Sequence, residues 1–203
     1  MRGLYLVTPD WNDTDRLLEV TEAALQGGVA LLQYRHKTAV ASLRETQATA
    51  LLALCRRFGR RFIINDHVEL CLAIGADGVH VGGTDAAVAA VRAQVGPELI
   101  VGASCYGDLA LARAAHAAGA SYVAYGGFYP SRVKKYPVTT AMDILADSRA
   151  HVPLPKVVIG GMTPENSVPL VAAGADMVAA ISSVYLAENP KQAAASFVAL
   201  YKQ

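Results

Sequence analysis

The chain has 203 residues, of which 53% are hydrophobic and 17% charged, and its formal net charge is +1. This length and apolar content allow a sizeable core, and the near-neutral charge predicts no general attraction to nucleic acid or to an anionic membrane. No run approaches the ~18 apolar residues of a spanning helix, and the start, MRGLYLVTPDW, turns polar too soon for a signal peptide. A cytoplasmic protein with neither nucleic acid nor membrane as a partner is therefore expected.

Short apolar runs alternate with longer Ala/Leu-rich segments along the whole chain. Strands are predicted at residues 4–8, 30–35, 61–66, 78–81, 99–104, 122–127, 156–161 and 177–182. Helices are predicted near residues 14–27, 41–58, 67–75, 85–95, 108–118, 139–149, 164–173 and 190–201. Nearly continuous apolar strands are typical of parallel strands covered by helices. Eight such units predict an α/β fold with one catalytic domain over residues 1–203, a single (β/α)₈ TIM barrel around a closed parallel eight-stranded sheet. An open doubly wound sheet remains the alternative.

Four helices are expected to end on glycine in a recurring phrase, LQGGVAL, AIGADGV, AAGASYV and AAGADMV. Gly28, Gly75, Gly119 and Gly174 stand where a left-handed residue ends a helix before the next strand. We interpret this repeat as structural.

Polar residues gather where the predicted strands end. In a closed parallel barrel, catalytic groups stand at the carboxyl ends of the strands and in the loops that follow them. These positions hold Gln33, Tyr34, Arg35, Lys37, Asn65, Asp66, Asp85, Ser104, Ser131, Arg132, Lys134, Lys135, Gly160, Gly161, Ser182 and Ser183. They predict a single cup lined by polar groups.

Two chemistries meet in this cup. Arg35, Lys37 and Lys134 are suited to a highly charged anion, since guanidinium and ammonium groups pair with phosphate oxygens. Asp66 and Asp85 are suited to Mg²⁺, which takes one or two carboxylates and completes its shell with water and substrate phosphate. Together they indicate a diphosphate ligand. A second phosphate position is indicated by VVIGGMT and AAISS, where glycine and helix-start amides follow strands seven and eight.

Each of these features also has a structural explanation. Asp66 and Asp85 could simply cap the helices that follow them, since aspartate is a preferred N-cap residue. The basic residues of QYRHK and GFYPSRVKKY could belong to solvated loops. His80 is interpreted as a hydrogen-bonded residue of the barrel interior. Cys55, Cys71 and Cys105 are interpreted as reduced, buried thiols, and no base near Ser104 or Cys105 supports covalent catalysis.

Six segments in this order resemble the thiamine phosphate synthase family. They are QYRHK, IINDHVELCLAIGADGVHVGGTD, VGASCY, YPSRVKK, VIGGMTPEN and AAISSV. The resemblance covers essentially the whole chain. It implies a (β/α)₈ barrel and a Mg²⁺-dependent transferase that acts on two phosphorylated heterocycles. The enzyme joins 4-amino-2-methyl-5-(diphosphooxymethyl)pyrimidine to a plain or carboxylated thiazole phosphate. The products are thiamine phosphate and pyrophosphate, with CO₂ from the carboxylated substrate.

The resemblance also implies roles for the strand-end residues. The pyrimidine diphosphate would contact Gln33, Tyr34, Arg35, His36, Lys37, Asn65, Ser104 and Lys134. The thiazole phosphate would contact Ser131, Arg132, Val133, Gly161, Ile181 and Ser182. Asp66 and Asp85 would bind Mg²⁺. Arg35, Lys37 and Lys134 would be catalytic, since they would neutralise the departing pyrophosphate in a dissociative substitution.

The sequence departs from the family pattern at three of these places. The usual HxGQxD is HVGGTD, so Gly83 replaces a glutamine. The usual PTxTK is PSRVK, so Val133 replaces a hydroxyl residue. Tyr106 stands where a histidine is frequent.

Two other functions stay open at this stage. A barrel similar to thiazole tautomerase would share the phosphate position but would need no diphosphate or metal. A non-catalytic sensor of phosphorylated ligands would share the binding residues. Oligomeric state, a homo-oligomer included, is left open.

Overall fold

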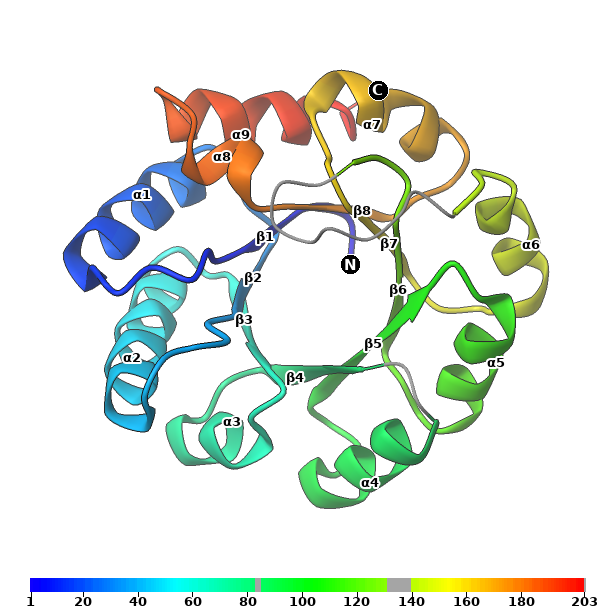
Figure 1. The fold of residues 1–203 in the computed structure, drawn as a ribbon, viewed down its shortest axis with the longest axis horizontal. Coiled ribbons are helices and arrows are strands. Elements are labelled where there is room, and N and C mark those ends of the chain that lie inside the picture. The colour runs from blue at the N-terminus through cyan, green and yellow to red at the C-terminus, as the bar shows by residue number, and fades with distance from the viewer. Residues whose placement is uncertain (83–84, 131–139, 203) are drawn as a thin grey trace.

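The computed structural model describes residues 1–82, 85–130 and 140–202, and for Asp85 and Ala86 the backbone alone. Eight strands form one closed barrel in chain order (Figure 1). They are β1 (Gly3–Val7), β2 (Leu31–Tyr34), β3 (Arg61–Asn65), β4 (Gly78–Gly82), β5 (Ile100–Tyr106), β6 (Tyr122–Gly126), β7 (Lys156–Ile159) and β8 (Met177–Ala180). Every neighbouring pair is parallel, and β1 closes the barrel against β8 through the register Gly3 to Met177. The predicted closed barrel is confirmed, and the open sheet is excluded.

The helices form a ring outside the strands (Figure 1). In the described residues they are α1 (Thr14–Gln26), α2 (Ala41–Arg57), α3 (Val68–Ile74), α4 (Asp85–Val95), α5 (Leu109–Ala117), α6 (Ile144–His151), α7 (Pro164–Ala172), α8 (Ser182–Tyr185) and α9 (Pro190–Ala199). The four-residue α8 was not predicted, because a single turn has no hydrophobic period.

Helix α6 begins five residues later than predicted. The reason is a tether between Thr140 and the end of β6: the Thr140 amide donates to the Gly127 carbonyl at 3.3 Å, and its hydroxyl donates to the Gly126 carbonyl. These bonds hold the chain against the strand before the helix starts.

Alternation along the strands divides the core into two layers. Successive side chains of a strand point to opposite faces. Val79, Val101 and Val123 pack outward against the helices, whereas Tyr5, Ile63 and Met177 pack inside the barrel. The barrel is therefore filled with side chains, and ligands are confined to its two mouths.

The recurrent glycines end their helices as predicted. Gly28, Gly75, Gly119 and Gly174 all have positive φ angles, 100°, 69°, 91° and 109°. Glycine adopts the left-handed backbone conformation without the steric cost of a Cβ atom. This explains the repeated glycines, and no functional role is needed.

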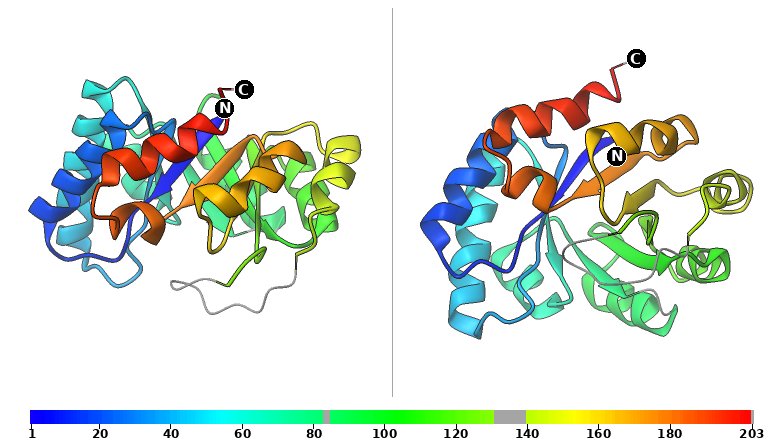
Figure 2. Two further views of the ribbon diagram at one scale, coloured as in Figure 1. Left: turned by 90° about the horizontal axis from the view of Figure 1, so that it is seen from above. Right: turned by 45° about the horizontal axis from the view of Figure 1, so that its top comes forward.

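The start of the chain lies beside the residues that follow α9, as the left view of Figure 2 shows. The guanidinium carbon of Arg2 lies 5.7 Å from the centre of the Tyr201 ring, which joins the start of β1 to the residues after α9. Among the described residues, no helix is long and apolar enough to cross a membrane.

Candidate active site

The loop after β2 carries the cationic side chains and is held by the residues that follow β1. The Arg35 amide donates to the Thr8 hydroxyl at 2.8 Å, and that hydroxyl donates back to the Arg35 carbonyl at 3.0 Å. Asp10 accepts from Nη1 of Arg35 at 3.3 Å and from the Lys37 amide at 2.9 Å. The side chain of Arg35 is only 12% exposed, so this carboxylate fixes the guanidinium before any ligand arrives.

Asp66 has a contact set that is not that of a helix cap. Its φ is 63°, in the left-handed region that aspartate tolerates better than most residues. Its carboxylate accepts from Nδ2 of Asn65 at 2.7 Å and from Nζ of Lys37. His67 is the N-cap residue of α3, and it makes no side-chain capping bond. The capping explanation therefore fails for Asp66, whose carboxylate projects from the end of β3 beside a cation.

Some residues at the carboxyl ends of the strands could act as ligands to a hard cation. Asp66 supplies carboxylate oxygen, and the backbone of Asp85 starts α4 directly after β4, the strand that pairs with β3. Among the residues described, no three acidic, histidine or cysteine side chains form a metal cluster. Mg²⁺ does not require three, because substrate phosphate and water supply its remaining oxygens. Asp66 and the position of Asp85 are therefore compatible with Mg²⁺.

The floor of the cup is a polar row inside the barrel. Nε2 of Gln33 lies 2.6 Å from the Tyr5 hydroxyl, which lies 2.6 Å from the Tyr122 hydroxyl. Nδ1 of His80 lies 2.8 Å from the Tyr122 hydroxyl, and its Nε2 lies 2.8 Å from Oγ of Ser104. Burial holds the pKa of both tyrosines above the ordinary value of 10.0, so both keep their protons. The interpretation of His80 as a hydrogen-bonded interior residue is confirmed.

Tyr34 does not join this cup. Its side chain belongs to the outer layer, where its hydroxyl donates to Oε1 of Gln47 on α2 at 2.9 Å. Strand alternation is the reason, because Gln33 already points to the interior and Tyr34 must point outward. A role for the Tyr34 side chain in the pyrimidine diphosphate pocket does not fit this geometry. His36 is also buried, and its Nε2 lies 3.1 Å from Oδ1 of Asn12 in the loop after β1.

The end of β7 meets the chain that leaves β6, and α8 begins directly after β8. Gly160 and Gly161 have φ angles of 113° and 64°, and a Cβ on Gly161 would lie 2.2 Å from the Pro130 carbonyl oxygen. Nδ2 of Asn166 donates to the Gly161 carbonyl at 2.9 Å, which ties this turn to the start of α7. Ile181 is the N-cap residue of α8 and Ser182 its first residue. A close backbone approach thus explains Gly161, and phosphate contacts by Gly161, Ile181 and Ser182 stay a prediction.

Six of the positions singled out in the sequence lie outside the described residues, Lys135 among them. The other five are Gly83, Ser131, Arg132, Val133 and Lys134. The described neighbours Pro130 and Thr140 both lie at the carboxyl ends of β6 and β7, where Pro130 meets Gly161 and Thr140 meets Gly126.

Known sequences and structures identify the family to which this barrel belongs. The family model described as "Thiamine monophosphate synthase" matches residues 4–184. The chain belongs to the thiamine monophosphate synthase family. It is 69% identical over 201 residues to a thiamine-phosphate synthase from Janthinobacterium sp. (strain Marseille), covering 99% of this chain and 97% of that protein. It is 48% identical over 199 residues to a thiamine-phosphate synthase from Thiobacillus denitrificans, covering 98% of this chain and 94% of the relative.

Solved structures agree with this membership of the thiamine monophosphate synthase family. The thiamine phosphate pyrophosphorylase from Pyrococcus furiosus superimposes with a TM-score of 0.84 at 29% identity, over 98% of this chain and 94% of that chain. A 3-hexulose-6-phosphate synthase superimposes with a TM-score of 0.72 at 20% identity over 98% of this chain and 99% of that chain, which shows the shared fold alone. The predicted family and fold are both confirmed.

Sequence reasoning missed several residues that organise the site of this family member. Thr8 and Asp10 follow β1, so the rule that identified the other strand ends would have found them. Tyr5 and Tyr122 gave no such signal, because an apolar strand with one tyrosine is ordinary and the partners are 117 residues apart. Only the closed barrel brings them together.

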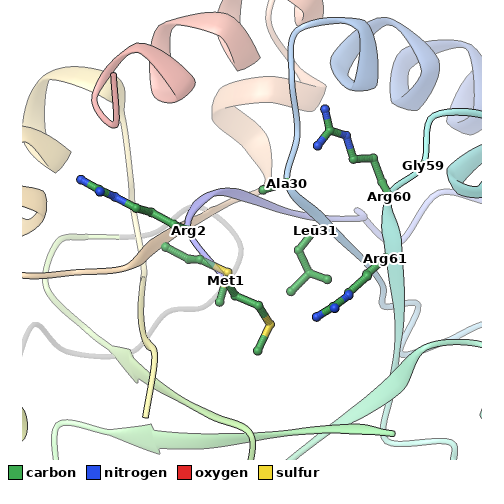
Figure 3. Close-up of a pocket in the computed structure, with 8 residues that line it drawn as sticks. Met1, Arg2, Ala30, Leu31, Gly59, Arg60 and Arg61 are labelled. Carbon is green, nitrogen blue, oxygen red and sulfur yellow. The ribbon is translucent and has the colours of Figure 1, made fainter. Parts of the chain in front are cut away.

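A cavity of about 320 Å³ lies at the opposite mouth of the barrel (Figure 3). Its lining includes Met1, Arg2, Leu31, Arg60, Arg61 and Met177. Arg2 and Arg60 extend in different directions from its rim (Figure 3), so these two do not converge on a shared ligand. It lies at the amino ends of the strands, whereas the catalytic groups of TIM barrels stand at the carboxyl ends. The described residues predicted to form the active site lie at the opposite mouth, at the carboxyl ends of the strands.

Proposed function

We propose that this chain makes thiamine phosphate from two phosphorylated heterocycles. One substrate is 4-amino-2-methyl-5-(diphosphooxymethyl)pyrimidine, and the other is 4-methyl-5-hydroxyethylthiazole phosphate or its carboxylated form. The bond between the pyrimidine methylene carbon and the diphosphate oxygen breaks, and a bond from that carbon to the thiazole nitrogen forms. Pyrophosphate leaves, together with CO₂ when the carboxylated substrate is used. The observation that carries this proposal is identity of 69% with a thiamine-phosphate synthase over 99% of the chain.

The cationic loop after β2 has the geometry for stabilising the departing pyrophosphate. Asp10 and Thr8 hold Arg35 and the Lys37 backbone in place, so little reorganisation is needed when negative charge develops. The side chain of Lys37 is 50% exposed and pairs with Asp66, so it can turn toward a bound anion at small cost. Lys134 would add a third cation from the connection after β6.

Asp66 and Asp85 would hold Mg²⁺ against the diphosphate of the substrate. Bound there, the ion would supply positive charge that neutralises the phosphate oxygens. The chain's own residues position the two substrates, with Gln33, Asn65 and Ser104 on the pyrimidine side. Ser131, Arg132, Val133, Gly161, Ile181 and Ser182 would contact the thiazole phosphate. The electron-rich aminopyrimidine can carry the methylene cation until the thiazole nitrogen captures it, so the protein needs no nucleophile.

Product analysis tests this function directly. The purified chain is mixed with both heterocycles, with and without Mg²⁺, and the products are separated by chromatography. We expect equal amounts of thiamine phosphate and pyrophosphate, and only when the metal is present. An isomerised carboxythiazole phosphate without pyrophosphate would instead indicate a tautomerase, and two ligands recovered unchanged would indicate a sensor. We further propose that residues 1–203 act as one catalytic domain in the cytoplasm.

A further inference from the structure

Five polar side chains form a continuous row from one side of the barrel interior to the other. They are Gln33 on β2, Tyr5 on β1, Tyr122 on β6, His80 on β4 and Ser104 on β5, and we call them the barrel hydrogen-bond chain. Their four successive contacts measure 2.6, 2.6, 2.8 and 2.8 Å. The first four side chains are buried, and only Ser104, at the carboxyl end of its strand, is half-buried. The row therefore ends at the cup.

The neighbouring residues are packed so that the barrel hydrogen-bond chain fits inside the barrel. The rings of His80 and Tyr122 stack with their centroids 5.6 Å apart, and those of Tyr5 and Tyr122 meet edge to face at 5.8 Å. A Cβ on Gly102 would lie 2.2 Å from the Tyr122 hydroxyl oxygen and 2.6 Å from Nδ1 of His80. Gly102 is thus the strand residue whose missing side chain allows these two groups to meet.

The first donor in the row fixes the direction of all the others. The side-chain amide nitrogen of Gln33 can only donate a hydrogen bond, so the Tyr5 hydroxyl oxygen accepts from it. The Tyr5 proton is buried, and in the described part of the chain its one remaining partner is the Tyr122 oxygen. Tyr122, which now accepts from Tyr5, must donate its own proton to Nδ1 of His80. A neutral imidazole that accepts at Nδ1 carries its proton on Nε2.

We propose that the barrel hydrogen-bond chain has one fixed direction, which holds His80 as the Nε2–H tautomer and makes Ser104 a hydrogen-bond donor to the substrate. Nε2 of His80 donates to Oγ of Ser104, so the Ser104 proton turns toward the cup. A donor there meets an acceptor on the pyrimidine diphosphate, and in this respect the inference rests on the proposed function. Tyr5, Tyr122 and His80 are positioning residues that act through Ser104.

Nitrogen NMR of the wild-type protein tests the direction without any substrate. Histidine labelled with ¹⁵N distinguishes a protonated ring nitrogen from an unprotonated one, and the His80 signals are assigned by their absence from a His80→Gln sample. We expect Nδ1 to be unprotonated and Nε2 protonated. A proton on Nδ1 would overturn the proposal, because the chain would then run in reverse and Ser104 would accept from the substrate. This spectrum decides the direction even if the enzyme makes no thiamine phosphate, so failure of the proposed function is seen separately.

Kinetics of Tyr122→Phe test whether the chain acts through Ser104. Loss of one hydroxyl frees the His80 tautomer, and we expect kcat/KM for the pyrimidine diphosphate to fall about tenfold while KM for the thiazole phosphate is unchanged. Tyr125→Phe is the matched control. Tyr125 lies on the same strand and is buried, but its hydroxyl donates to Oγ of Ser148 on the helix side at 2.7 Å. It should lower stability without changing kcat/KM or the His80 spectrum.

A double-mutant cycle separates positioning from a structural effect. Ser104→Ala should lower kcat/KM at least as much as Tyr122→Phe, and the double variant should be no worse than Ser104→Ala alone. If the losses of kcat/KM in the two single variants multiply in the double variant, Tyr122 does not act through Ser104. The same conclusion would follow if Tyr122→Phe and Tyr125→Phe had equal kcat/KM.

Discussion

Asp66 combines a left-handed backbone with a carboxylate that faces two donors. Asp66→Asn keeps the side-chain size and a residue that tolerates φ near 63°, and removes only the charge. Because the proposed Mg²⁺ site would depend on that charge, we expect turnover to fall about 10²-fold or more. Steady-state rates over a Mg²⁺ titration, with circular dichroism as the check on folding, measure this.

Asp108→Asn is the matched control for that substitution. Asp108 follows β5 at the same mouth and caps α5 through the Ala110 amide at 2.7 Å, a role that asparagine performs equally well. Its activity should be unchanged. A folded Asp66→Asn enzyme with the turnover of Asp108→Asn would remove Asp66 from the metal site.

Asp10 is a single residue that holds the loop carrying Arg35 and Lys37. Asp10→Ala removes two acceptors from that loop, and we expect KM for the pyrimidine diphosphate to rise about tenfold, with KM for the thiazole phosphate unchanged. Asp10→Asn should be milder, since its amide oxygen can still accept from the Lys37 amide. Equal changes in both KM values would mean that Asp10 stabilises the barrel rather than the loop.

Helix α7 shows how one element is tied to the site. The Thr163 hydroxyl accepts from the Asn166 amide, and Oδ1 of Asn166 accepts from the Thr163 amide at 2.8 Å, a complete capping box. Thr163→Ala should lower the free energy of unfolding by about 1 kcal/mol. Because Asn166 also donates to the Gly161 carbonyl, KM for the thiazole phosphate should rise as well.

Urea unfolding and steady-state kinetics measure the two effects of Thr163→Ala. Ser196→Ala is the control, since its hydroxyl only donates to the Gln192 carbonyl on the exposed face of α9 at 3.0 Å. That change should stay within about 0.5 kcal/mol. If Thr163→Ala lowers stability but leaves KM for the thiazole phosphate unchanged, the cap stabilises α7 without affecting phosphate binding.

At the scale of the whole molecule, the barrel buries its three thiols between strands and helices. Burial raises the pKa of Cys71 to about 11 and those of Cys55 and Cys105 to about 12, from an ordinary value of 9.0. The unfolded chain therefore loses these protons at lower pH than the folded chain does. This contribution to stability is complete below the ordinary value and is lost as the pH rises through the folded values.

Unfolding by urea at several pH values checks this expectation. We expect nearly constant stability between about pH 7 and 8.5 and a fall above that, and a thiol reagent at neutral pH should label Cys55, Cys71 and Cys105 only after unfolding. Rapid labelling of the native protein, or stability that is flat to about pH 11, would contradict burial of the thiols.

Much of this molecule follows from local signals in the sequence. Apolar runs of β-branched residues specified eight strands, and glycines such as Gly75 specified where helices end, because both depend on neighbouring residues alone. Arg35, Lys37 and Asp66 could be assigned to one mouth, since all carboxyl ends of a parallel barrel share a face. The other contacts of the site form only when the strands close into a barrel. Only the paired strands brought Tyr5 to Tyr122 and Asp10 to Arg35, and only strand alternation turned Tyr34 away from the cup. Contacts between residues distant in sequence depend on register and curvature, which no short segment encodes by itself.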